Sequence, residues 1–167
     1  MMIRVGVLTA SDRGARGERD EDRSAAVIRE LVSGIGGEVQ SYVVVPDEQE
    51  AIAAALRRMA DEEGMELVLT TGGTGLGPRD VTPEATMDVA QRLVPGIPEA
   101  MRREGAAHTP RAMLTRAVAV ARGGCLIVNL PGSPRGVREN LGAVLEALGH
   151  AVELLRGAVQ DCARPED

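Results

Sequence analysis

Short apolar runs alternate with longer segments of mixed polarity in the first half of the chain. Residues 3–9, 38–45 and 67–71 are rich in aliphatic and β-branched side chains, which predicts three strands. Residues 22–33 and 47–63 lie between them and carry apolar side chains at helical spacing, which predicts two helices. The pattern therefore predicts that strands and helices alternate along the chain.

Polar residues and prolines predict where two helices begin. Asp47, with Glu50 three residues later, has the spacing of a capping box. Thr82 precedes Pro83, and proline suits the first position of a helix, so we expect Thr82 to cap a helix there. The Pro95-Gly96 pair is expected to break or restart that helix.

The second half of the chain is less regular. Residues 99–115 predict a short helix followed by a loop. Residues 117–121 and 125–130 predict two strands, which the glycine pair between them can join as a hairpin. The remainder is expected to be helical, with a break at Gly149 and a polar tail.

Alternating strands and helices predict an α/β fold with a mostly parallel sheet and helices on both faces. No repeat or linker divides the chain, so residues 1–167 are expected to form a single domain. In such sheets, ligands bind beyond the carboxyl ends of the strands. The segments expected to leave strands at that edge are 11–17, 46–47, 71–80 and 131–136.

The segment Thr70–Asp80 (TTGGTGLGPRD) is the strongest functional signal in the chain. Its four glycines are more than one turn needs. Glycines let main-chain N–H groups approach an anion, and the helix that follows adds a favourable dipole. Asp80 is either a surface charge or cap, or a ligand for a metal ion that accompanies a phosphate. The residues predicted here to bind nucleotide or phosphate are Thr71, Gly72, Gly73, Thr74 and Gly75.

Composition excludes several chemistries. All 19 basic residues are arginine, which rules out a Walker-type phosphate lysine, a pyridoxal Schiff base and a lysyl–adenylate. Phenylalanine and tryptophan are absent, so a bound base must be recognised by shape, aliphatic walls and main-chain hydrogen bonds. A net charge of −6 without a basic block argues against nucleic acid as a partner. No apolar run approaches membrane-spanning length and no signal-peptide pattern is present, so we expect a cytoplasmic protein with no membrane partner.

Other polar positions follow predicted strands. Asp47 is either a helix cap or a carboxylate that faces a ligand, and Asp12 follows the first strand closely. Pro131 and Gly132 begin a second loop, which suits an anion at a helix start. Ser133 in that loop lacks the Gly-x-Ser-x-Gly spacing of a nucleophile elbow, which disfavours a serine hydrolase.

Histidine and cysteine add little to these candidates. His108 is a candidate for lining a site, and His150 is expected on a helix surface. Cys125 lies in an apolar run and is expected to be a small core residue; with Cys162 it forms no metal-ligand pattern. Two carboxylates, two glycine loops and no general base indicated by the pattern favour phosphoryl or nucleotidyl transfer. In such reactions Mg²⁺ held by aspartates neutralises phosphate charge.

Four segments together carry a family signature: Thr70–Thr86 (TTGGTGLGPRDVTPEAT), Pro46–Glu48, Asn129–Pro134 and the opening strand with Ser11-Asp12-Arg13. They resemble the molybdopterin adenylyltransferase family, the MogA/MoaB-type domain of molybdenum cofactor biosynthesis that also occurs in gephyrin. The resemblance covers nearly the whole chain. It implies a three-layer α/β/α sandwich that assembles as a homotrimer.

The resemblance also implies a reaction and a site. Molybdopterin and ATP, with Mg²⁺, would give adenylyl-molybdopterin and pyrophosphate. The two important aspartates of the family fall on Asp47 and Asp80, which would hold Mg²⁺ and organise the triphosphate. A family serine falls on Thr115, which keeps the hydroxyl and adds a methyl group. The residues that the resemblance assigns to the pterin are Ser11, Asp12, Thr115 and Arg116.

Two other functions remain open at this stage. A paralogue of the family can be a non-catalytic module that binds pterin and acts as a scaffold, as in gephyrin. A related domain opens the competence-damage proteins and cleaves nucleotides, although those chains usually continue into a second domain. A molybdenum-insertion protein is a candidate partner if the chain is an adenylyltransferase.

Overall fold

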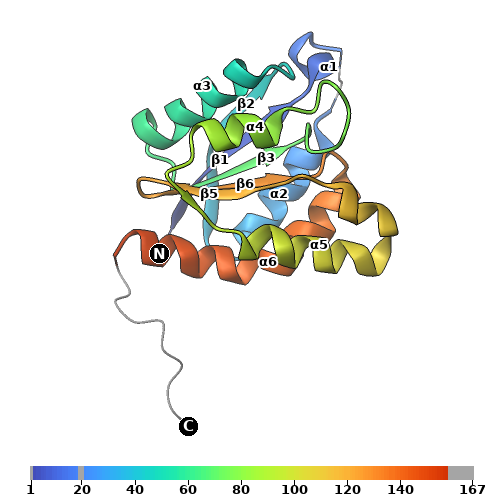
Figure 1. The fold of residues 1–167 in the computed structure, drawn as a ribbon. Coiled ribbons are helices and arrows are strands. Elements are labelled where there is room, and N and C mark those ends of the chain that lie inside the picture. Colours follow the sequence, from blue (N-terminus) through green and yellow to red (C-terminus); the bar gives the residue numbers. More distant parts are fainter. Residues whose placement is uncertain (1, 19–20, 158–167) are drawn as a thin grey trace.

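The computed structural model describes residues 2–18 and 21–157, in which six strands form one sheet with helices on both faces (Figure 1). The strands are β1 (Ile3–Ala10), β2 (Gly37–Val45), β3 (Leu67–Thr71), β4 (Arg92–Leu93), β5 (Ala119–Arg122) and β6 (Cys125–Leu130). Their order across the sheet is β2-β1-β3-β6-β5-β4. The first four in this order are parallel, and β5 and β4 are antiparallel to their neighbours. This confirms the predicted α/β class, the mostly parallel sheet and the hairpin.

The helices form two layers, one on each face of the sheet (Figure 1). They are α1 (Asp12–Ala15), α2 (Arg23–Ser33), α3 (Gln49–Arg57), α4 (Thr82–Asp88), α5 (Gly96–His108) and α6 (Pro134–Leu155). A π-helical turn, η1 (Arg58–Glu62), extends α3, and a 3₁₀ helix, η2 (Pro110–Leu114), follows α5. Helices α3 and α4 cover one face, and α2, α5 and α6 cover the other.

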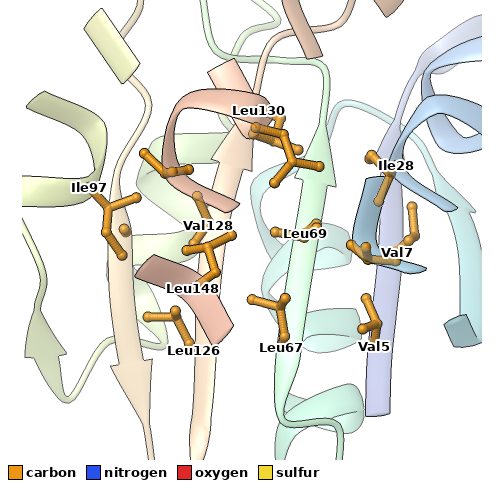
Figure 2. Close-up of a cluster of buried hydrophobic side chains, with 14 of the residues drawn as sticks. Val5, Val7, Ile28, Leu67, Leu69, Ile97, Leu126, Val128, Leu130 and Leu148 are labelled. Atoms are coloured by element: carbon orange, nitrogen blue, oxygen red, sulfur yellow. The ribbon is translucent and has the colours of Figure 1, made fainter. Parts of the chain in front are cut away.

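Alternation along the central strands divides the core into two clusters. Leu67 and Leu69 of β3 pack on the side of α2 and α6, whereas Val68 between them packs on the side of α3 and α4. Figure 2 shows the first cluster, where Ile28 of α2 and Leu148 of α6 meet the strand side chains. Burying each such aliphatic side chain is worth roughly 1.5–3 kcal/mol, so both layers are held by aliphatic packing.

Cys125 at the start of β6 is a small core residue, as predicted. It is 2% exposed, and burial raises the pKa of its thiol to about 12. The thiol therefore stays protonated and unreactive at neutral pH. Cys162 and most of the predicted polar tail lie outside the described residues.

Three elements differ from expectation, one of them because packing outweighs a local signal. Helix α6 continues through Gly149, where a break was expected. Leu148 and Val152 on either side are fully buried, and their burial exceeds the cost of about 1 kcal/mol of a helical glycine. Strand β4 was not predicted, because its two residues are too few to show a period. The short helix α1 likewise lies in a segment expected to be a loop.

Both predicted caps are wrong. Helix α4 begins at Thr82 itself, and the Thr82 hydroxyl donates to the carbonyl oxygen of Gly72 (2.9 Å). Helix α3 has Glu48 at its N-cap without a side-chain cap bond, while Glu50 pairs with Arg57. The Asp47 carboxylate accepts from the Asp12 main-chain N–H instead. In both cases the side-chain oxygen expected to cap the helix forms a hydrogen bond with a residue distant in sequence instead.

The parallel strands bring the predicted loops together. The registers pair the last residues of β1 with those of β2 and β3, and the last residues of β3 with those of β6. The segments that follow these four strands therefore meet at the carboxyl edge of the sheet, as expected. Within the described residues, no helix combines the length and the apolar character needed to cross a membrane.

Candidate functional site

Two cavities open at the carboxyl edge of the sheet. The smaller has a volume of about 130 Å³ and the larger about 460 Å³. The smaller cavity is lined by Thr9, Ala10, Ser11, Asp47, Thr71, Gly72, Gly73, Asp80 and Gly132. The residues of the larger cavity include Thr74, Gly75, His108, Thr115, Pro131 and Ser133. Consecutive residues of both glycine loops thus line the two cavities in turn, which makes the cavities neighbours.

The first glycines of the main loop are required by close approach. Gly72 has φ +93°, and a Cβ atom there would collide with the carbonyl oxygen of Ala10. Gly73 has φ +67°, and a Cβ atom there would collide with the Thr82 hydroxyl. The second loop lies against the first, since a Cβ atom on Gly132 would lie 3.4 Å from the Cα atom of Gly72. A larger residue at either of the first two positions would push apart β1, α4 and the loop.

Asp80 folds back into the same loop. Its Oδ2 atom accepts from the Gly77 main-chain N–H (2.8 Å). A Cβ atom on Gly75 or on Gly77 would lie 2.9 or 2.8 Å from this oxygen, so both glycines make room for the carboxylate. Among the described residues, no hydrogen bond reaches the other oxygen, Oδ1. That oxygen is available for a ligand in the smaller cavity.

Asp47 and Asp12 hold each other by a reciprocal pair of bonds. The Asp12 main-chain N–H donates to Asp47 Oδ2 (2.9 Å), and the Asp47 N–H donates to Asp12 Oδ1 (3.0 Å). Arg79 from the glycine loop donates to both oxygens of Asp12 (2.9 and 3.0 Å), which lowers the pKa of that carboxyl group. Asp12 is therefore an anchor that is already paired, and Asp47 keeps its Oδ1 atom toward the cavity, near Gly73.

The surroundings of Asp47 favour a cation. Partial burial raises the pKa of its carboxyl group, the bond from the Asp12 N–H opposes this rise, and the charges of Asp12 and Asp80 add to it. The part of the chain that the structure describes holds no cluster of three or more His, Cys, Asp and Glu side chains suited to a metal. Two carboxylates in one cavity nevertheless suit Mg²⁺, which usually binds one or two carboxylates together with waters and substrate phosphates. The residues present thus fit the metal that the sequence predicted.

Hydroxyl groups near the loops bind protein atoms. The Thr71 hydroxyl donates to the carbonyl oxygen of Pro131 (2.7 Å), so this side chain joins the two loops. The sequence had suggested a bond from this residue to a phosphate instead. The Ser24 hydroxyl of α2 donates to the carbonyl oxygen of Gly132 (2.8 Å). Ser133 caps α6 by accepting from the Gly136 N–H (3.1 Å). The loops are therefore held rigidly around the cavities.

A buried polar network beneath the loops was not predicted. The Asn129 side-chain amide on β6 donates to the hydroxyls of Thr70 (3.0 Å) and Thr86 (2.9 Å), and all three residues are fully buried. The Thr86 hydroxyl in turn donates to the carbonyl oxygen of Thr82 in α4 (2.8 Å). The network fixes α4 on the ends of β3 and β6. Polar residues within the two apolar runs, Thr70 and Asn129, were the only sequence signal for it.

The four residues assigned to the pterin occupy different places. Ser11 caps α1 and lines the smaller cavity, whereas Thr115 lines the larger one. Asp12 is bound to Arg79. The Arg116 side chain binds the glycine loop, with Nε donating to the carbonyl oxygen of Gly75 (2.7 Å). The structure thus brings Asp47 and Asp80 together but does not gather the predicted pterin residues in one cavity.

Several residues of the site were missed in the sequence. His108 lines the larger cavity, as the sequence suggested, whereas Glu139 and Asn140 of α6, which also line it, were not predicted. Arg79 lies within the glycine motif, yet its bond to Asp12 depends on the meeting of β1 and β3 and has no local pattern. The side chains of α6 could have been found only as the polar positions of a long amphipathic helix that follows the second loop.

Comparison with known proteins identifies relatives over nearly the whole chain. The family described as "Probable molybdopterin binding domain" matches residues 6–150. A protein of Helicobacter pylori named molybdopterin adenylyltransferase is 43% identical over 157 residues, which are 93% of this chain and 89% of that protein. Gephyrin of Dictyostelium discoideum is 42% identical over 160 residues, which are 90% of this chain and 22% of that protein. The crystal structure of the molybdopterin biosynthesis enzyme MoaB from Thermus thermophilus matches with a TM-score of 0.88 and 54% identity, covering 93% of this chain and 98% of that one.

Proposed function

This chain belongs to the molybdopterin-binding domain family, and we propose that it is a molybdopterin adenylyltransferase of molybdenum cofactor biosynthesis. In the proposed reaction, an oxygen of the terminal phosphate of molybdopterin attacks the α-phosphorus of ATP. The bond between the α-phosphorus and the oxygen that bridges to the β-phosphate breaks, and pyrophosphate leaves. The products are adenylyl-molybdopterin and pyrophosphate.

The observation that carries this proposal is that Asp47 and Asp80 line one small cavity that adjoins a larger one. Their carboxylates would hold Mg²⁺, which neutralises phosphate charge when bound and so favours attack on the α-phosphorus. The volume of about 130 Å³ suits a phosphate group with its cation, not a whole nucleotide. The triphosphate is therefore proposed to reach this cavity while the rest of the substrates lies outside it.

The larger cavity is proposed to receive the pterin of molybdopterin. Its volume of about 460 Å³ lies within the usual range of roughly 300–1,000 Å³ for small-molecule sites. Thr115 supplies a hydroxyl there, and Ala112 and Leu114 supply aliphatic walls. Because the two glycine loops form part of both cavities, a phosphate on the pterin can meet the α-phosphate at their boundary. This placement gives catalysis by proximity, the main contribution that a protein makes to phosphoryl transfer.

Pyrophosphate release tests the proposal. The purified chain should release pyrophosphate only when Mg²⁺, ATP and molybdopterin are all present. Asp80→Asn, which keeps the shape and loses the charge, should lower the turnover number by at least about 10²-fold, the typical cost of removing one key charge-stabilising group. Asp88→Asn is a matched control, because Asp88 is exposed at the end of α4. An Asp80→Asn variant with the wild-type turnover number contradicts the assignment.

Assembly and location are part of the proposal. The homotrimer that the resemblance implies and the cytoplasmic location that the sequence predicted remain predictions, as does a molybdenum-insertion protein as partner. Light scattering measures the first directly, since a trimer has three times the monomer mass of 17.5 kDa. A solution mass near that of the monomer contradicts it.

A second candidate function is a scaffold module that binds molybdopterin without transferring an adenylyl group. The likeness to a segment of gephyrin, a much longer protein, favours it. The presence of both aspartates in one cavity favours the transferase instead. Calorimetric binding of molybdopterin without any pyrophosphate release on addition of Mg·ATP would establish the scaffold function.

A further inference from the structure

Arg116 donates hydrogen bonds to both ends of the segment Thr74–Asp80. Its main-chain N–H donates to the carbonyl oxygen of Thr74 (2.9 Å), and its Nε donates to that of Gly75 (2.7 Å). Its Nη2 atom donates to the carbonyl oxygen of Asp80 (2.5 Å). The segment from Thr74 to Asp80 is thereby closed into a ring, with Arg116 joining its two ends.

Glu84 completes this arrangement from α4. The carboxylate pairs with Nη1 of Arg116 through Oε1, and Oε2 is a buried oxygen without a hydrogen-bond partner in the described residues. A buried unsatisfied polar atom costs about 1–3 kcal/mol. The pair therefore costs free energy at this oxygen while it holds Nη1 of Arg116 against the first turn of α4.

We propose that Arg116 is a positioning residue that fixes the Asp80 carboxylate and thereby sets the affinity for Mg·ATP. This inference rests on the proposed function, since it assumes that Asp80 holds the cation. The ring that Arg116 closes brings the Gly77 N–H onto Asp80 Oδ2. Asp80 lines the smaller cavity, and its Oδ1 accepts no hydrogen bond among the described residues. If Arg116 is removed, the Asp80 carbonyl is released and the carboxylate samples other positions.

The same residue links the two cavities. Thr115, its neighbour in the chain, lines the larger cavity, while the Arg116 guanidinium holds the wall of the smaller one. The guanidinium already donates to three protein groups, so it has little capacity for a phosphate. The proposed role in the cation site is an alternative to the contact with the pterin that the resemblance implied for Arg116.

The test compares Arg116→Gln with Arg102→Gln. Arg102 is a matched control because its Nη1 donates to the carbonyl oxygen of Ala117 (3.2 Å), one residue beyond Arg116, and in the described part of the chain it makes no hydrogen bond to the glycine loop. Calorimetry of the full chain with Mg·ATP measures affinity, and turnover assays measure KM for molybdopterin. Arg116→Gln should raise the Kd for Mg·ATP at least about tenfold, the usual scale for loss of a group that orients a metal ligand. The KM for molybdopterin should stay within about twofold, and Arg102→Gln should change neither constant.

Two further measurements separate positioning from a general loss of structure. Glu84→Gln leaves the carbonyl bonds of Arg116 intact and should raise the Kd for Mg·ATP by less than Arg116→Gln does. In an Asp80→Asn background, Arg116→Gln should have little further effect on that Kd, because the group that it positions has lost its charge.

Three results overturn the inference. The first is an unchanged Kd for Mg·ATP in a folded Arg116→Gln variant, and the second is additive effects of the Arg116 and Asp80 substitutions. The third is a raised KM for molybdopterin with normal Mg·ATP binding, which would place Arg116 on the substrate. A wild-type chain that binds Mg·ATP but releases no pyrophosphate contradicts the proposed transferase instead, and the binding comparison still tests Arg116.

Discussion

Acidic side chains at the two ends of the sheet differ in their hydrogen-bond partners and in the direction of their pKa shifts. At the amino end, Glu66 just before β3 receives Arg156 Nε on Oε1 (2.6 Å) and Arg156 Nη2 on Oε2 (2.7 Å). The Arg4 main-chain N–H donates a third hydrogen bond, to Oε2 (2.9 Å). The pKa of Glu66 is lowered to about 2, chiefly by the hydrogen bonds from Arg156. At the carboxyl end, Asp47 receives no hydrogen bond from an arginine within residues 2–18 and 21–157, and burial raises the pKa of its carboxyl group.

The contrast teaches how to separate a structural carboxylate from one that serves a ligand. The Glu66 carboxylate is fully paired, so its charge stabilises the folded chain. The Asp47 and Asp80 carboxylates line one cavity, and among the described residues Asp80 Oδ1 accepts no hydrogen bond, which suits the cation proposed above. A bound cation would neutralise the carboxylates at the carboxyl end, as Arg156 neutralises the Glu66 carboxylate at the amino end.

The largest expected effect is on turnover at Asp47. Asp47→Asn should lower the turnover number by about 10²-fold or more, because a charge that holds the cation is lost. It should not lower the free energy of unfolding. Because the pKa of Asp47 is raised in the folded state, its negative charge lowers the free energy of unfolding at neutral pH. Asparagine removes that charge, and its Oδ1 can still accept from the Asp12 main-chain N–H. Chemical denaturation and the pyrophosphate assay check both halves. A clear loss of stability in this variant contradicts the comparison.

The opposite outcome is expected at Glu66. Glu66→Gln should lower the free energy of unfolding by about 2 kcal/mol, since the charge-assisted bonds to Arg156 are weakened, and should leave turnover unchanged. Glu30→Gln is the matched control: its ion pair with Arg138 is well exposed, so no measurable change is expected. A loss of turnover in folded Glu66→Gln protein would show that the amino end also serves the site.

The stabilisation by Glu66 should depend on pH in a defined window. The folded pKa of about 2 lies below the ordinary value of 4.5, so the contribution is fully present above about pH 5. It should shrink as the pH falls from about 4.5 to about 2, as protons bind first to the unfolded chain. Urea denaturation of the wild type and Glu66→Gln along this range should therefore converge at low pH. A difference that stays constant would assign the effect of the substitution to packing.

The smallest effect is expected where the carboxyl end uses an ordinary structural bond. Thr71→Val removes the hydroxyl that joins the two loops and should lower the free energy of unfolding by about 1 kcal/mol. Thr71→Ser keeps the hydroxyl and serves as the control. Because this hydroxyl donates to Pro131 and not to a phosphate, the Kd for Mg·ATP should change little. A large rise in that Kd for Thr71→Val alone would restore the sequence-based role of Thr71 in phosphate binding.

Much of the fold could be predicted because its determinants are local. The apolar runs at residues 3–9 and 67–71 and the glycines between elements predicted the strands, and parallel pairing then placed the loops at one edge. The positions of Asp47 and Asp80 in one cavity followed from that topology. Strand β4 is too short to leave a pattern.

What escaped prediction depends on contacts between distant segments. Asp47 and Thr82 have good local caps, yet the first binds Asp12 and the second binds Gly72. Arg79 and Arg116 look alike in the sequence, but one anchors Asp12 and the other closes the glycine loop. Only the packed structure distinguishes these pairings, because each joins groups that the sheet topology brings together.

A crystal structure of the chain with Mg²⁺ and a non-hydrolysable ATP analogue tests the central claim most directly. The account predicts the metal in the smaller cavity, at about 2.0–2.1 Å from oxygens of Asp47 and Asp80 or joined to them by its waters, and in contact with the triphosphate. A metal and triphosphate bound away from both carboxylates would contradict it.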